Sequence, residues 1–175
     1  LNIGWAWTAT SKGCHSPMDC LRDGRHGISP HRRYQGCPED VQLALDYLLK
    51  IQKENGDLSG QGLMYCHSIA SIALCEAYGI TKDERLRGPA ERSISYTLAA
   101  QSKSRGGWRY NPGEDSDTSI TGWQYMALHS ARLAGLTVPE ENFERARKWL
   151  DRSGGGKHGG LYGYQGPGTK WPAMI

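Results

Sequence analysis

The chain has 175 residues and a mass of 19.4 kDa, which suits one domain or a large part of one. Hydrophobic residues make up 38% of it, and no apolar run approaches the roughly 18 residues that cross a membrane, so we expect no membrane span. Charged residues of both signs amount to 22%, which argues against wholesale disorder, and a net charge of +3 is too small to indicate nucleic acid as a partner.

Residues 1–37 are predicted to form an irregular segment rich in Gly, His and Arg. They contain neither an initiator Met nor a signal segment, so no cellular location is predicted. Three cysteines there remain open to three interpretations, namely free thiols, one disulfide, or a metal site with nearby histidines: Cys14, Cys20 and Cys37. A basic stretch favours a solvated loop, with an anionic partner as the alternative: Arg22, Arg25, His26, His31, Arg32 and Arg33.

An internal repeat of about 50 residues follows, in which each unit is a helix, a Gly-rich turn and a second helix. Tyr47 and Gln52, near the end of one predicted helix, recur as Tyr96 and Gln101, both 49 residues later. Trp149 belongs to a third copy, 53 residues after Tyr96. The Gly-rich turns that follow the three copies lie at 55–58, 106–108 and 159–162.

The two helices of a unit differ in character. The first is amphipathic, and its copies are predicted at 39–53, 88–102 and 140–152, each with a proline near the first turn. The second, over 67–77 and 118–134, is apolar or small on most sides, which is typical of a buried helix. Alternating outer and inner helices of this kind predict an all-α fold, a partial α/α toroid of stacked helical hairpins over residues 38–175.

The third repeat is incomplete at its C-terminal side, because no inner helix follows its outer helix. We therefore expect exposed apolar surface on that outer helix, from Phe143, Ala146, Trp149 and Leu150. Such a surface favours two partners, the remainder of a longer polypeptide or a second copy of the chain.

The middle repeat carries a specific resemblance. Tyr96, Leu98 and Gln101, followed by Gly106-Gly107-Trp108, resemble the QW repeat of squalene–hopene and oxidosqualene cyclases, within the wider terpene-cyclase and prenyltransferase α/α-toroid superfamily. In that family the Gln holds helix ends and the Trp stacks near it, so we expect Trp108 to be buried beside Gln101 or the adjoining outer helix. The first repeat has Leu58 at the Trp position, and the third has Gly154 at the Gln position. The resemblance also implies that the chain is a fragment of a longer protein.

A short acidic motif lies between the second turn and the second inner helix. Asp115-Ser116-Asp117-Thr118 is similar to the D-x-D-D motif of squalene–hopene cyclases, whose middle Asp protonates the substrate, with Thr118 in place of the last Asp. Asp117, assisted by Asp115, is therefore the candidate catalytic acid, since a neighbouring carboxylate or an apolar site raises the pKa of such a group. The alternative, which we favour, is that Asp117 is an ionised N-cap with a low pKa.

Six residues near the inner helices are candidate substrate-binding residues. Aromatic rings stabilise a carbocation through their faces, and four lie near the acidic motif: Trp108, Tyr110, Trp123 and Tyr125. Tyr65 and His67 begin the other inner helix at the equivalent place.

Protein prenyltransferase β-subunits resemble this fold and hold zinc with an Asp, a Cys and a His, for which Cys66, His67 and Asp117 are the candidates here. Adjacent residues project about 100° apart on a helix, which makes joint ligation awkward. We therefore favour a core Cys beside a hydrogen-bonded His and expect no metal or other cofactor.

Two function classes remain. The first, which we favour, is a non-catalytic binding or scaffold module of the α/α-toroid type. The alternative is one wall of a terpenoid cyclase that cyclises its substrate through carbocations, started by the Asp acid. The first class would present its Gly-rich turns to a protein or glycan, and an isoprenoid-like apolar molecule is a further candidate ligand.

Overall fold

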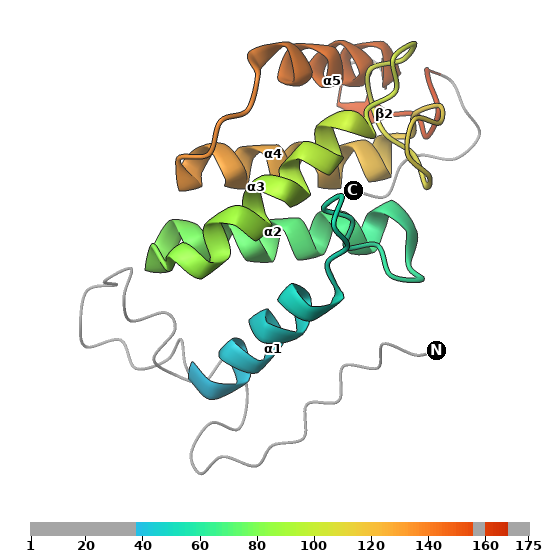
Figure 1. Ribbon diagram of the computed structural model, residues 1–175. Helices are drawn as coiled ribbons and strands as arrows, with labels where there is room; N and C mark the ends of the chain where they lie inside the picture. The colour runs from blue at the N-terminus through green and yellow to red at the C-terminus, as the bar shows by residue number, and fades with distance from the viewer. Residues whose placement is uncertain (1–37, 156–159, 168–175) are drawn as a thin grey trace, which may run out of the picture. The chain divides into compact units, whose positions relative to one another are not determined.

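The computed structural model describes residues 38–155 and 160–167, which are drawn in colour in Figure 1. That part of the chain holds these elements: α1 Pro38–Ile51, α2 Leu63–Thr81, α3 Glu84–Ala99, α4 Thr118–Ala134, α5 Glu140–Ser153, β1 Gly154–Gly155 and β2 Leu161–Tyr162. The predicted all-α class is confirmed, because the only strands among the described residues form one two-residue antiparallel pair. The segment 1–37, with its three cysteines and its basic stretch, lies outside the described residues.

The chain divides into two units, Leu1–Leu43 and Ala44–Ile175, and all contacts described below lie within the second. The inner helices α2 and α4 form its main helix interface, α3 packs on both, and α5 packs on α4. Gly79 of α2 lies so close to α4 that a Cβ atom there would be 3.1 Å from the Cβ of Ala134. Fully buried side chains fill this interface, among them Leu74, Cys75, Ala127, Leu128 and Ala131.

Helix boundaries follow capping residues more closely than prolines. Helix α4 begins and ends where predicted, because Asp117 caps its first turn and Gly135, at φ +88°, donates its N–H to the last carbonyls. Helix α3 begins at Glu84, four residues earlier than predicted, because the Asp83 side chain accepts the N–H of Arg85. Pro89 therefore lies inside α3, where it removes one backbone donor from the helix.

The repeat is visible in equivalent hydrogen bonds between neighbouring hairpins. The Met64 N–H of α2 donates to the Tyr110 carbonyl at 3.1 Å, and the Thr118 N–H of α4 donates to the Tyr164 carbonyl at 2.9 Å. Donors and acceptors are both 54 residues apart, so the start of each inner helix binds the turn of the following repeat. The predicted stacking of helical hairpins of about 50 residues is confirmed.

The inner helices are not buried on all sides, which corrects the sequence prediction. Each leaves part of its surface in solvent, where Ile69 of α2 and Trp123, Met126 and Leu133 of α4 are exposed. The three α4 residues follow the spacing of a single helix face, with Leu133 88% exposed. This inner face, comprising Ile69, Trp123, Met126 and Leu133, arises because the neighbouring helix and the outer helices cover only the remaining sides of α2 and α4.

Helix α2 also bears on the expectation that no apolar run is long enough to cross a membrane. Its 19 residues reach a mean hydropathy of 1.2 over an 18-residue window, so by length and composition it is the one described helix that qualifies. Half of that window is buried inside the protein. Core helices of globular proteins meet the same criterion, so this is weak evidence for a membrane span.

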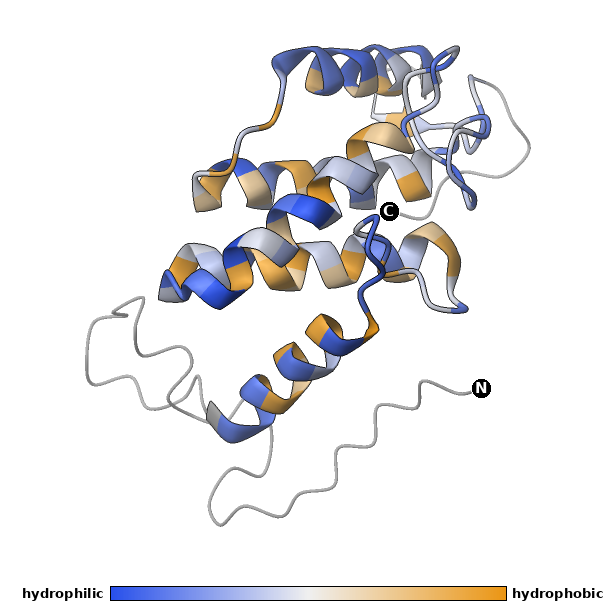
Figure 2. Ribbon diagram, in the orientation of Figure 1, coloured by the Kyte–Doolittle hydropathy of each residue, from blue (hydrophilic) through white to orange (hydrophobic). Residues whose placement is uncertain are grey.

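The expected apolar surface of α5 is absent, and that prediction is wrong. Phe143, Ala146 and Trp149 are buried and Leu150 is half-buried, because the apolar stripe of α5 packs on α4 and on the turn at 102–106. The Phe143 ring meets the Tyr125 ring edge to face, with 5.5 Å between ring centroids. Figure 2 shows the result, a helix that is hydrophilic along most of its surface.

Candidate functional site

The turn between the second outer and inner helices is anchored by Gln101 and Trp108. The Gln101 side-chain amide donates to the carbonyls of Gly106 at 2.7 Å and Asn142 at 3.0 Å, which ties the turn to the start of α5. The Trp108 indole is 1% exposed, and its Nε1 donates to the Thr97 carbonyl of α3 at 2.8 Å. The predicted burial of Trp108 beside the outer helix is confirmed. Its indole therefore packs within the protein and is not available to a ligand.

The first repeat uses the same arrangement with different side chains. Gln52 donates to the Pro89 carbonyl at 2.9 Å, and the buried Leu58 stands where the second repeat has Trp108. His67 Nδ1 accepts the Leu58 N–H at 3.1 Å, just as Thr121 Oγ1 accepts the Trp108 N–H at 3.0 Å. His67 thus fastens a turn to an inner helix, as Thr121 does one repeat later.

His67 is held in its neutral form. Its ring is fully buried, and Nε2 lies 3.2 Å from the Ser93 carbonyl and 3.0 Å from Thr97 Oγ1. Since Nδ1 accepts a backbone N–H, Nε2 carries the proton and donates it. Burial lowers the pKa of His67 to about 4, against the opposing effect of Asp57.

This pKa makes stability depend on pH. Because the folded-state pKa lies below the ordinary value of 6.5, the unfolded chain takes up the proton first as the pH falls. The His67 contribution is complete above pH 6.5 and is lost as the pH falls towards 4. At about 1.4 kcal/mol per pH unit, urea denaturation at pH 5 should show about 2 kcal/mol less stability than at pH 7. His67→Gln should remove this difference, whereas His129→Gln should largely keep it; an unchanged pH dependence in His67→Gln would contradict the assignment.

Asp117 is the N-cap of α4, as expected, but its pKa is shifted in the direction opposite to the one expected. Its Oδ1 accepts the Ile120 N–H at 2.8 Å and the Ser119 hydroxyl at 2.9 Å. The carboxyl group is 0% exposed, and Oδ2 has no hydrogen-bond partner among the described residues. Burial raises the pKa of Asp117, while the cap hydrogen bonds and Arg109 act in the opposite direction. The predicted low pKa is therefore wrong, because the cap lies in the core and not at the surface.

Asp115 does not share this environment. Its side chain is 43% exposed, and Oδ1 lies 3.2 Å from Nε of Arg105. The same oxygen accepts the Ser116 N–H at 2.8 Å. Asp115 is therefore an exposed, ion-paired carboxylate, and it is not among the groups that raise the pKa of Asp117.

Two of the candidate aromatic residues do lie near Asp117. The Tyr65 hydroxyl donates to Ser119 Oγ at 2.7 Å, and Ser119 donates in turn to Asp117. The Tyr65 and Tyr110 rings are 6.1 Å apart, and the Tyr110 hydroxyl lies 2.6 Å from the Tyr164 hydroxyl. The structure thus assembles a Tyr–Ser–Asp cluster, which we define as Tyr65, Tyr110, Asp117, Ser119 and Tyr164, where α2 and α4 begin. Sequence reasoning missed Ser119 and Tyr164, although the repeat aligns Tyr164 with Tyr110.

The other two aromatic candidates point elsewhere. Trp123 is 39% exposed on the inner face. Tyr125, two residues on and so about 200° around the helix, packs between α4 and α5 against Phe143 and His129. The six candidate residues therefore do not converge on one cavity.

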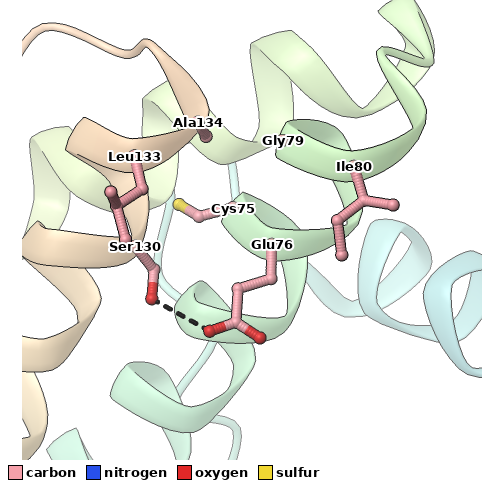
Figure 3. Close-up of a pocket in the computed structure, with 7 residues that line it drawn as sticks. All are labelled: Cys75, Glu76, Gly79, Ile80, Ser130, Leu133 and Ala134. Carbon is pink, nitrogen blue, oxygen red and sulfur yellow. Dashed lines mark hydrogen bonds between the residues drawn. The ribbon is translucent and has the colours of Figure 1, made fainter. Parts of the chain in front are cut away.

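A shallow pocket of about 230 Å³ lies between the C-terminal halves of α2 and α4 (Figure 3). Ser130 donates to the Glu76 carboxylate at 3.2 Å, and Ile80 of α2 and Leu133 of α4 line opposite sides of the pocket. None of the predicted substrate-binding residues lines this pocket.

Over residues 38–155 and 160–167, no group of three or more His, Cys, Asp or Glu side chains is placed to hold a metal ion. Cys66 is a half-buried free thiol, and both ring nitrogens of His67 are engaged as described. The zinc set considered from the sequence, Cys66, His67 and Asp117, is thus not assembled.

No curated protein and no solved structure matches the chain. The model of one protein family does match, over residues 41–163, which include all five helices except the first residues of α1. That family is described as the squalene-hopene cyclase N-terminal domain, and the stacked hairpins and the Gln-anchored turns lie within the matched span. The chain therefore belongs to the squalene-hopene cyclase N-terminal domain family.

Proposed function

We propose that this cyclase-like repeat module binds an apolar ligand and does not itself supply a catalytic acid. The observation that carries this proposal is the complete burial of Asp117. An acid that protonates a substrate has to come within hydrogen-bond distance of it. Asp117 Oδ1 instead accepts the Ile120 N–H in the first turn of α4, and Oδ2 is buried in the protein interior.

The side chains of the inner face support an apolar, isoprenoid-like ligand. Its exposed side chains are two aliphatic residues, a thioether and an indole: Ile69, Leu133, Met126 and Trp123. Large apolar side chains exposed on two packed helices suit an interaction site, and isoprenoid chains offer methyl and methylene groups that match them. The Trp123 ring adds a flat aromatic surface for the double bonds of such a chain.

Calorimetric titration with farnesol, an isoprenoid alcohol, tests this proposal. Met126→Asp places a charge in the centre of the inner face and should weaken farnesol binding at least tenfold. Leu161→Asp is the matched control, since Leu161 is 66% exposed but lies in β2, away from that face. Equal weakening by both variants, or no binding by the parent chain, would contradict the proposal.

One observation favours a second function, in which Asp117 is the catalytic acid of a terpenoid cyclase. Asp117 Oδ2 is buried without a partner among the described residues, and burial raises the pKa of the carboxyl group. Both features suit a protonated carboxylic acid. Conversion of squalene by the chain, abolished by Asp117→Asn, would establish this function and replace the one proposed above.

Substitutions of Asp117 distinguish a cap from an acid through stability. Asp117→Asn keeps an oxygen for the Ile120 N–H and removes a buried charge, so unfolding free energy should change by less than about 0.5 kcal/mol at pH 7. Asp117→Ala loses the cap and should cost about 1 kcal/mol. Carboxyl-detected NMR titration gives the pKa directly, and a value above about 6 would favour the acid over the cap.

A further inference from the structure

Five cations gather where the second turn meets α5. We call this surface the basic junction and define it as Lys103, Arg105, Arg145, Lys148 and Arg152. Two come from the turn at 102–106 and three from α5, and the turn and the helix lie against each other in Figure 1. With the nearby Asp115, Asp151 and Glu141 counted, the surface keeps an excess of two positive charges.

Contacts between the turn and α5 hold these side chains together. Arg145 donates to the Ser102 carbonyl at 2.7 Å, and Arg152 donates to the Arg105 carbonyl. The Arg105 guanidinium lies 6.0 Å from the centre of the Trp149 ring. Lys103 and Lys148 are exposed and form no ion pair with any described residue, so their charges are available to a partner.

The equivalent place in the first repeat, where the turn around Gly56 meets α3, is the first junction, and it forms without three of these cations. Its turn and outer helix make the same contacts, because Gly56 lies against the Arg92 carbonyl as Gly106 lies against that of Arg145. In this alignment the positions of Lys148 and Arg152 are occupied by Ser95 and Ala99. The position of Arg105 is occupied by Asn55, and Glu54 precedes it. Three of the five cations, Arg105, Lys148 and Arg152, are therefore particular to the second junction, whereas Lys53 and Arg92 occupy the positions of Lys103 and Arg145 in the first.

We propose that the basic junction docks an acidic peptide segment of a partner protein. From Arg145 to Arg152 the helix rises about 10 Å, which three to four residues of an extended peptide span. Guanidinium groups pair with carboxylates through two parallel hydrogen bonds. Single-stranded nucleic acid needs exposed aromatic rings on which bases stack, and the aromatic ring at this site, Trp149, is 1% exposed.

Fluorescence anisotropy with a labelled peptide of six glutamates tests the proposal on the full chain at low ionic strength. Lys148→Glu should weaken binding several-fold, and the double variant Lys103→Glu, Lys148→Glu at least about tenfold, with binding also falling as salt is added. Lys50→Glu is the matched control, because Lys50 is an exposed lysine in the last turn of α1 and the change in net charge is the same. It should leave the affinity within twofold.

Three results would overturn the proposal. Equal weakening by Lys50→Glu would show that net charge alone attracts the peptide. Tighter binding of a single-stranded oligonucleotide than of the glutamate peptide would point to the other class of partner. Binding of a six-glutamine peptide with the same affinity would show that the carboxylates are not recognised.

Discussion

Trp108→Ala should lower the free energy of unfolding by about 3–5 kcal/mol, which is a large part of the stability of a typical domain. The indole is 1% exposed, and its removal leaves a cavity between α3, α4 and the second turn. It also leaves the Thr97 carbonyl without the Nε1 donor at 2.8 Å. Urea denaturation followed by circular dichroism measures the change.

Trp123→Ala serves as the comparison, because Trp123 is exposed on the inner face and should cost less than about 1 kcal/mol. Trp108→Phe should fall between the two, since it keeps an aromatic ring but loses the hydrogen bond to Thr97. If both alanine variants lost similar stability, Trp108 would not be the anchor of the turn.

The fold was predictable from the sequence because the side chains that recur in the repeat also make the hydrogen bonds between neighbouring repeats. Gln52 and Gln101 stand 49 residues apart, and each donates to a backbone carbonyl of the next outer helix, Pro89 in α3 or Asn142 in α5. Asp117 and Gly135 gave the bounds of α4 directly. The start of α3 differs from the sequence prediction, because Pro89 indicates a helix start near residue 88 whereas Asp83 provides the cap.

The environment of the candidate site was less predictable, because burial is a property of packing between distant segments. The sequence identified Asp117 as a cap, but its raised pKa depends on the strand-like segment at Trp108 and the turn at Tyr164 covering it. Likewise, α5 was expected to expose its apolar stripe. No local pattern indicates that Tyr125 and His129 of α4 offer a surface to Phe143.

His67 shows how a chemically suggestive residue acquires a structural role. A histidine next to a cysteine at a helix start suggests a metal ligand, whereas the repeat pairs it with Thr121, 54 residues later. Both side chains accept a backbone N–H from the turn of their own repeat. Comparing the hydrogen bonds of the repeats, and not only their residue types, distinguishes a structural role of His67 from a metal-binding one.

Gly56→Ala should destabilise the first junction by about 2–5 kcal/mol, because two separate effects add. Gly56 has φ +91°, a conformation that costs a residue with a side chain about 1–2 kcal/mol. A Cβ atom there would also lie 2.1 Å from the Arg92 carbonyl oxygen, so the turn and α3 have to move apart, at about 1–3 kcal/mol. That movement would lengthen the hydrogen bond from Gln52 to the Pro89 carbonyl.

Gly60→Ala separates the two effects. Gly60 also has a left-handed backbone, with φ +55°, but no atom lies within 4 Å of the position of its Cβ. It should therefore cost only the conformational term, about 1–2 kcal/mol. The difference between the two losses of unfolding free energy, measured by denaturation, gives the cost of the close Cβ contact. Hydrogen exchange should show faster opening of the α3 amides in Gly56→Ala alone. Equal losses would mean that the junction tolerates a methyl group, and the close approach of the turn to α3 would then not hold the first two repeats together.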